Sequence, residues 1–295
     1  MKIATTIEEV RQEVREWKRQ GLTVGLVPTM GALHEGHASL VERAYRDCNR
    51  VVASVFVNPT QFAADEDLES YPRDFEEDCR ILQRKGCHLV FHPSVSEMYP
   101  EGFATYVELT SDMTKQLCGK TRPGHFKGVC TVVSKLFNIV TPDKAYFGEK
   151  DAQQLAVIRR MVFDMAMDVK IVGCPTVREA DGLAKSSRND YLNDDERKAA
   201  CVLYRALQAA LEYIGDGPHA VAVSAPGTSA GPCTEASNVL PLIRNIIAEE
   251  PLAEIDYIEI VDGETLQPVE IIKAGDLIAI AIYIGKTRLI DNVRV

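Results

Sequence analysis

The chain has 295 residues, 46% of them hydrophobic and 26% charged, and its formal net charge at pH 7 is −10. This balance predicts a globular protein with one large and one smaller domain, and the negative charge argues against nonspecific binding to nucleic acid or membranes. Because the N-terminal residues lack an apolar signal core and no run approaches 18 apolar residues, we expect a cytoplasmic protein without a transmembrane helix.

The first 177 residues alternate between predicted strands and predicted helices. Residues 8–20 have the spacing of an amphipathic helix, and the short apolar runs at 22–27 and 51–57 predict buried strands. Such alternation is typical of a doubly wound, Rossmann-like parallel sheet with helices on both faces. We therefore predict an α/β domain over residues 1–177, with ligands at the carboxyl ends of its strands. The remaining predicted strands are 88–91, 144–148 and 169–173, and the remaining predicted helices are 40–45, 75–85, 129–139 and 154–165.

The rest of the chain, residues 178–295, has a different pattern. Helices are predicted at 194–214 and 238–249, followed by β-branched runs at 255–261 and 277–284. This order predicts a smaller α+β domain with an antiparallel sheet. Residues 215–236 are rich in Gly, Pro, Ser and Ala and are interpreted as an inserted surface loop without a catalytic role. The eight cysteines contain no Cys-x-x-Cys pair and indicate reduced thiols rather than disulfides or a metal site.

The strongest motif is Met30-Gly31-Ala32-Leu33-His34-Glu35-Gly36-His37, which joins the strand at 22–27 to the next helix. His34 and His37 are three residues apart, so they share one face of the first helical turn. The two glycines permit close approach of a ligand, and a helix start offers unpaired N–H groups and a partial positive charge. The segment therefore predicts a triphosphate site without a P-loop. A helix cap with incidental histidines and a metal-binding pair are the alternatives, although no third ligand stands at a motif spacing nearby.

A second motif, Lys185-Ser186-Ser187-Arg188, follows the last predicted strand of the α/β domain. Two hydroxyls and a fixed cation are suited to hold the β- and γ-phosphates while charge builds on a leaving pyrophosphate. Taken alone, this tetrapeptide is typical of a solvated surface loop. Its value as evidence comes from its occurrence together with the histidine motif.

These two motifs resemble the HIGH and KMSKS signatures of the nucleotidylyltransferase superfamily, which includes class I aminoacyl-tRNA synthetases. More closely, the chain resembles the pantothenate synthetase (pantoate–β-alanine ligase) family over nearly its whole length. The blocks that carry this resemblance are Val27-Pro28-Thr29-Met30-Gly31, Phe56-Val57-Asn58-Pro59-Thr60-Gln61-Phe62, Tyr71-Pro72-Arg73-Asp74, Arg122-Pro123-Gly124-His125-Phe126, Phe147-Gly148-Glu149-Lys150-Asp151 and Leu289-Ile290-Asp291-Asn292.

The resemblance implies an ATP-dependent carbon–nitrogen ligase that joins (R)-pantoate to β-alanine through a pantoyl adenylate, with release of AMP and diphosphate. It implies Mg²⁺ bound with ATP, no protein-held metal, and a homodimer. His37 takes the proton-donor position and His34 is its catalytic neighbour. Pantoate is assigned to Gln61 and Gln154, and β-alanine to Gln61. The implied ATP-binding residues are Met30, Gly31, Ala32, Leu33, His34, Glu35, Gly36, His37, Gly148, Glu149, Lys150, Asp151, Val177, Lys185, Ser186, Ser187 and Arg188.

One departure from the family pattern concerns Lys185, where Met or Leu is expected. We expect the Lys185 side chain to point to water, because the family uses the backbone of this turn. Two other functions share the histidine motif. One is a nucleotidylyltransferase that moves AMP or CMP onto a phosphate, which would not need the paired glutamines. The other is a regulatory module that binds ATP without turning it over.

Overall fold

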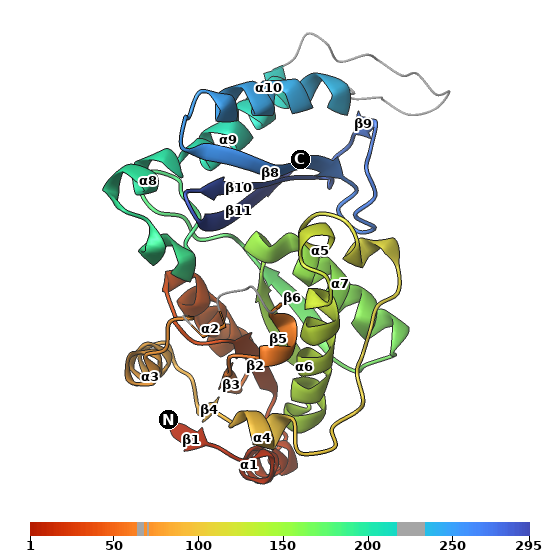
Figure 1. The fold of residues 1–295 in the computed structure, drawn as a ribbon. Helices are drawn as coiled ribbons and strands as arrows, with labels where there is room; N and C mark the ends of the chain where they lie inside the picture. Colours follow the sequence, from red (N-terminus) through yellow and green to blue (C-terminus); the bar gives the residue numbers. More distant parts are fainter. Residues whose placement is uncertain (64–67, 70, 217–233) are drawn as a thin grey trace. The chain divides into compact units, whose positions relative to one another are not determined.

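The computed structural model describes residues 1–63, 68–69, 71–216 and 234–295 (Figure 1). The chain forms two compact units, Met1–Val177 and Arg178–Val295. Most of the loop predicted at residues 215–236, together with Cys233, lies outside the described residues. The other seven cysteines are free thiols. Within the described ranges, every helix is too short or too polar to cross a membrane.

The first unit is built on a six-stranded sheet in which all strands are parallel, in the order β1-β4-β3-β2-β5-β6 (Figure 1). The strands are β1 Lys2–Ala4, β2 Val24–Thr29, β3 Arg50–Val55, β4 Leu89–Phe91, β5 Lys144–Gly148 and β6 Lys170–Cys174. The main helices are α1 Ile7–Arg19, α2 Glu35–Asp47, α3 Phe75–Arg84, α6 His125–Val140 and α7 Ala152–Asp164. Short elements connect them: η1 Pro59–Gln61, α4 Val95–Met98, η2 Asp112–Thr114, α5 Cys118–Thr121 and η3 Glu149–Asp151.

The order in which the chain adds strands to the sheet reverses between β2 and β5. From β2 the chain moves outward through β3 to β4, and it then returns past β2 to add β5 and β6 on the other side. Right-handed crossovers in opposite directions put helices on opposite faces of a parallel sheet. Accordingly, α2 and α3 pack together on one face, while α6 packs with α1 and α7 on the other.

Local sequence accounts for where these elements begin and what they bury. Helix α1 starts at a capping box in which Thr6 and Glu9 exchange hydrogen bonds with each other's backbone, and it buries Val10, Val14 and Trp17. Strands β2 and β3 are almost fully buried because helices cover both faces, which explains their uninterrupted apolar runs.

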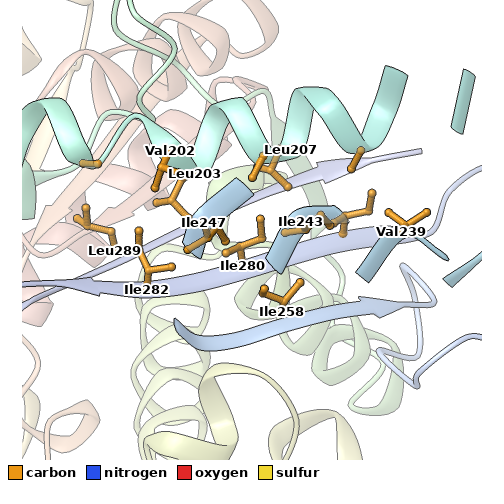
Figure 2. Packing of buried hydrophobic residues seen from close by; sticks show 14 of the residues in the cluster. Val202, Leu203, Leu207, Val239, Ile243, Ile247, Ile258, Ile280, Ile282 and Leu289 are labelled. Atoms are coloured by element: carbon orange, nitrogen blue, oxygen red, sulfur yellow. The ribbon is translucent and has the colours of Figure 1, made fainter. Parts of the chain in front are cut away.

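The second unit is a three-stranded antiparallel sheet, β11-β10-β8, covered by two helices (Figure 1). Its strands are β8 Ala253–Val261, β10 Leu277–Ile284 and β11 Thr287–Arg294, and a short pair forms between β7 Thr234–Glu235 and β9 Ile271–Ile272. Its helical elements are η4 Ser187–Tyr191, α8 Asp194–Ala199, α9 Val202–Asp216 and α10 Ala236–Ala248. Figure 2 shows side chains of both helices meeting isoleucines of the sheet, including Leu203, Ile243 and Ile280.

The fold class predicted from the sequence is confirmed: a parallel α/β sheet flanked by helices, followed by an antiparallel sheet with helices. Several details of the prediction are wrong, and the short strands β1, β7 and β9 are missing from it. The helix expected at 194–214 is two helices, α8 and α9, with a break at Ala200 and Cys201. Strand β11 was not predicted, because the polar residues Asp291 and Asn292 interrupt the alternation of apolar and polar residues that indicates a strand. In the structure β11 pairs with β10 along its length.

Candidate active site

Three of the predicted site segments begin where neighbouring parallel strands end. Met30 follows β2, the η1 turn with Gln61 follows β3, and Glu149–Asp151 follows β5. Because β2 lies between β3 and β5, these segments share one edge of the sheet, at the point where the chain changes direction. This is the position at which open α/β sheets bind ligands.

His34 and His37 lie at the start of α2 with their rings in contact, 4.2 Å between centroids. His34 is the N-cap residue, and its Nδ1 accepts a hydrogen bond from the Gly36 backbone N–H at 3.1 Å. Nδ1 of His37 accepts from the His34 backbone N–H at 3.4 Å. A neutral imidazole whose Nδ1 accepts a hydrogen bond carries its proton on Nε2. Both rings are therefore arranged to donate an N–H to a ligand through Nε2.

The charge state of His37 follows from its surroundings. The pKa of His37 is lowered to about 3, chiefly by burial and in addition by repulsion from His34, when that ring is protonated, and from Lys150. At neutral pH the free protein thus presents an uncharged N–H donor at this position. Lys150 therefore lies close enough to His37 for its charge to act on the imidazole, although these two residues are far apart in sequence.

The expectation of unpaired N–H groups at the start of α2 is wrong for His34 and Gly36. Their amides are occupied by the two imidazoles, as described above. The preceding loop amides are also bonded: Gly31 N donates to Thr29 Oγ1 at 3.3 Å, and those of Ala32 and Leu33 donate to Asp78. An anion bound here would meet imidazole N–H groups rather than these backbone amides.

Gln61 is held in a defined orientation by its neighbours. Its Oε1 accepts from Asn58 Nδ2 at 3.1 Å, so its Nε2 points the other way and donates to Met30 Sδ at 3.0 Å. Asn58 is itself buried, and its Oδ1 accepts from Tyr99 Oη at 2.7 Å. The glycine at 128 permits this packing, because a Cβ there would lie 2.3 Å from the carbonyl oxygen of Thr60.

The turn that carries Gln61 is also fixed from α6. His125, in the first turn of that helix, donates from Nδ1 to the backbone oxygen of Gln61 at 2.8 Å. Its Nε2 then faces Arg122 Nη1 at 3.3 Å and accepts from it. Both residues belong to a block quoted for the family resemblance, but the sequence alone did not indicate that they support Gln61.

Gln154 and Val177 are two further predicted site residues of the first unit, and both are partly exposed. Gln154 is partly buried in the first turn of α7, and its neighbour Gln153 is the buried one, donating to the backbone oxygens of Met113 and Gln116. Val177 is the last residue of the first unit and is partly exposed. The roles assigned to Gln154 and Val177 therefore stay predictions.

In the second unit, the segment Lys185–Arg188 leads out of a hairpin-like turn closed by a bridge between Arg178 and Ala184. The Ser186 hydroxyl accepts from the Arg188 backbone N–H at 3.3 Å and begins the η4 turn. The expectation that Lys185 points to water is wrong. Its side chain is only 20% exposed, and its Nζ lies 2.9 Å from Glu179 Oε2 within the same turn.

Two further observations concern metal ligands and a residue that sequence reasoning did not assign. Nowhere in the described ranges do three or more His, Cys, Asp or Glu side chains gather as a metal site. Asp78, which binds the loop before His34, was missed. A signal was present, because Asp78 stands at helical spacing between Phe75 and Leu82, where an amphipathic helix carries apolar residues.

Comparison with known proteins agrees with this arrangement. Residues 2–294 match the family model Pantoate-beta-alanine ligase. The curated pantothenate synthetase of Ruminiclostridium cellulolyticum is 53% identical over 292 residues, covering 99% of this chain and 98% of that protein. The pantothenate synthetase of Enterococcus faecalis is 51% identical with the same coverage.

Solved structures extend the comparison to the fold. Pantothenate synthetase from Thermus thermophilus superposes with a TM-score of 0.90 at 47% identity, covering 100% of this chain and 99% of that one. The pantoate–β-alanine ligase of Francisella tularensis, solved with β,γ-ATP and β-alanine, superposes with a TM-score of 0.77 at 34% identity, covering 100% and 97% of the two chains. Family model, sequence identity and fold agree over the full length, and the chain belongs to the pantoate–β-alanine ligase family.

Proposed function

We propose that this enzyme condenses (R)-pantoate with β-alanine at the expense of ATP, through a pantoyl adenylate. One observation carries the proposal beyond family membership: the Gln61 carboxamide reaches Met30 at 3.0 Å. The amide assigned to pantoate and the loop assigned to ATP thus meet at the ends of β2 and β3. A carboxylate held by Gln61 would lie beside a nucleotide held at the histidine motif, which is the proximity that adenylylation requires.

In the first step, a pantoate carboxylate oxygen attacks the α-phosphorus of ATP. The bond to the β-phosphate breaks, and pyrophosphate leaves with its Mg²⁺, which enters and departs as part of the nucleotide substrate. We assign His37 to donate its Nε2–H to an α-phosphate oxygen, because its Nδ1 is occupied by the His34 amide. Lys150, whose positive charge acts on His37, is assigned to the phosphates.

In the second step, the amine of β-alanine attacks the acyl carbon, loses a proton, and displaces AMP. Gln61 is assigned to both acids and Gln154 to pantoate. A neutral carboxamide reads hydroxyl and carboxylate groups without adding charge to a polyanionic site. The remaining ATP contacts are assigned to Met30–His37, Gly148–Asp151, Val177 and Lys185–Arg188. The second unit is proposed to act as a lid over the nucleotide, and the enzyme to work as a cytoplasmic homodimer, both by analogy with the family.

The test is an assay for AMP and pyrophosphate with MgATP, in which pantoate and β-alanine are omitted in turn. We expect pyrophosphate release to require pantoate and pantothenate to require both acids. With pantoate labelled by ¹⁸O in its carboxylate, one label should appear in AMP, because the attacking oxygen stays on phosphorus when the amine displaces AMP.

Three results would count against the proposal. Release of ADP instead of AMP would indicate transfer of the γ-phosphate. Unlabelled AMP would exclude the adenylate. ATP binding without turnover in the presence of pantoate would leave the regulatory module as the better description.

A further inference from the structure

The loop between β2 and the histidine pair has an unusual backbone. Gly31 and Ala32 are consecutive residues with positive φ, +86° and +51°. Alanine rarely adopts such a conformation, because its Cβ crowds the backbone, so a turn of this kind persists only where surrounding contacts hold it. His34 follows this turn directly as the N-cap of α2. The conformation at residues 31–33 therefore decides where the two imidazoles lie.

Asp78 provides the contacts that hold the turn. It lies on α3 and is only 3% exposed. Its Oδ1 accepts from the Leu33 N–H at 2.8 Å, and its Oδ2 accepts from the Ala32 N–H at 3.2 Å. The fit on the inner side of the turn leaves no room for a larger residue at 31, since a Cβ on Gly31 would lie 2.8 Å from Asp78 Oδ2. The carboxylate thus occupies the anion-binding concavity that the two amides form.

We propose that Asp78 is a positioning residue for the ATP site, which fixes the Gly31–Leu33 turn and thereby the His34–His37 pair without itself contacting the nucleotide. Each of the two amides donates to its own oxygen of one side chain, and among the standard residues of this length only aspartate carries two acceptor oxygens. The inference rests on the proposed function only insofar as residues 30–37 bind ATP.

Asp78 is a buried acid whose charge is opposed by its burial. Burial raises the pKa of Asp78 above its ordinary value; the hydrogen bonds from Leu33 and Ala32 act against that rise, Asp74 adds to it, and His92 acts against it. His92 is stacked on Phe75 of the same helix, with 3.9 Å between ring centroids. The neighbouring Cys79 thiol also interacts electrostatically with Asp78, and the two amide donors are hydrogen-bond partners of its carboxylate.

The decisive variant is Asp78→Asn, because a carboxamide accepts from one amide and turns an N–H toward the other. Glu77→Gln is the matched control: it removes the neighbouring carboxylate on the same helix, one that pairs with Arg80 and Arg84 at the surface. We expect Asp78→Asn to weaken binding of ATP, measured by calorimetry, by at least about tenfold, the factor associated with losing a charge-assisted hydrogen bond. The control should stay within about twofold, and the KM for pantoate should change by less than about threefold in either variant.

Hydrogen exchange separates positioning from a general loss of stability. In Asp78→Asn, exchange should accelerate in peptides covering residues 30–37 and remain unchanged in β4 and α6. Acceleration throughout the first unit, or ATP binding and local exchange equal to those of the control, would overturn the proposal. If Asp78→Asn does not fold, Asp78→Glu retains both oxygens one methylene further out, and the same local pattern is expected of it.

These readouts do not depend on ligation. If the wild-type protein binds ATP but gives no AMP with pantoate, the proposed function fails, while the role of Asp78 is still decided by ATP binding and exchange. If the wild-type protein ligates pantoate normally and Asp78→Asn matches the control, only the inference about Asp78 fails.

Discussion

Asp291 should be among the most costly side chains to remove from the second unit. Its side chain is 0% exposed and lies on β11, where Arg178 donates to it through two nitrogens, Nη1 to Oδ2 at 2.6 Å and Nη2 to Oδ1 at 2.9 Å. Arg178 also donates to the Gly182 carbonyl oxygen at 3.1 Å and lies over the Tyr204 ring at 4.8 Å. The pair therefore ties the turn at residues 178–184 to the sheet.

Replacement of Asp291 by Ala leaves the guanidinium partly buried without its counter-ion. Breaking a buried pair in this way costs about 3–5 kcal/mol, because the remaining charge is not resolvated. A domain is stable by only about 5–15 kcal/mol, so the variant should lose a large part of its stability. With a urea dependence of about 2 kcal/mol per molar, the midpoint of unfolding should fall by roughly 2 M.

The assay is urea unfolding of the whole protein, monitored by far-UV circular dichroism. Trp17, the chain's one tryptophan, lies in α1 and reports on the first unit separately by fluorescence. Lys198→Gln is the control, because its pair with Asp195 is 78% and 85% exposed and should be worth less than about 1 kcal/mol. The double variant Arg178→Met/Asp291→Leu should be more stable than Asp291→Ala, since no unpaired charge remains. A loss below about 1 kcal/mol in Asp291→Ala, equal to that of the control, would refute this reasoning.

The remaining predictions concern the active site. His37→Ala should reduce turnover by at least about 10² while leaving the circular dichroism unchanged, and near-normal turnover in a folded variant would contradict its assignment as the α-phosphate donor. Gln154→Ala should raise the KM for pantoate by about tenfold or more with ATP affinity within about threefold, and the reverse pattern would exchange the two assignments. Lys185→Met should change kcat/KM for ATP by less than about fivefold, because the lysine is neutralised by Glu179 in a partly exposed pair. Arg188→Ala, measured beside it, should lower kcat/KM for ATP far more. Equal losses in the two variants would place Lys185 among the catalytic residues. Because burial lowers the pKa of His37 to about 3 from an unfolded value of 6.5, only the unfolded state takes up this proton as the pH falls below 6.5, so the stabilisation is complete above pH 6.5 and is lost toward pH 3. Between pH 6.5 and 4.5 the unfolding free energy of the wild type should therefore fall by about 2 kcal/mol more than that of His37→Gln, and parallel curves for the two proteins would show that the histidine is not buried in this way.

The hydrophobic periodicity of the sequence and the positions of its Gly and Pro residues were sufficient to predict the fold class. The apolar runs of β2 and β3 are nearly unbroken because both faces of a parallel sheet are covered, and this pattern is visible without coordinates. The histidine motif could be located for the same reason, since it stands between a strand and a helix that are each evident from local residues. Gln61 and Lys150 were assigned from resemblance to a family, because isolated polar residues in loops carry no periodic signal. Lys185–Arg188 was noted for its hydroxyls and its cation, but it counted as evidence only together with the histidine motif.

What only the tertiary structure decided are contacts between residues that are distant in sequence. Asp78 meets the turn at Gly31–Leu33 because α3 and α2 pack on the same face of the sheet. Tyr99 holds Asn58, the residue that orients Gln61, across some forty residues. Glu179 and Lys185 are close in sequence, but their pairing depends on the shape of a turn that no local pattern indicates. The orientation of a hydrogen bond and the charge of a buried imidazole depend on which groups chain folding brings within about 3–4 Å, and that is set by packing of the whole unit rather than by any one segment.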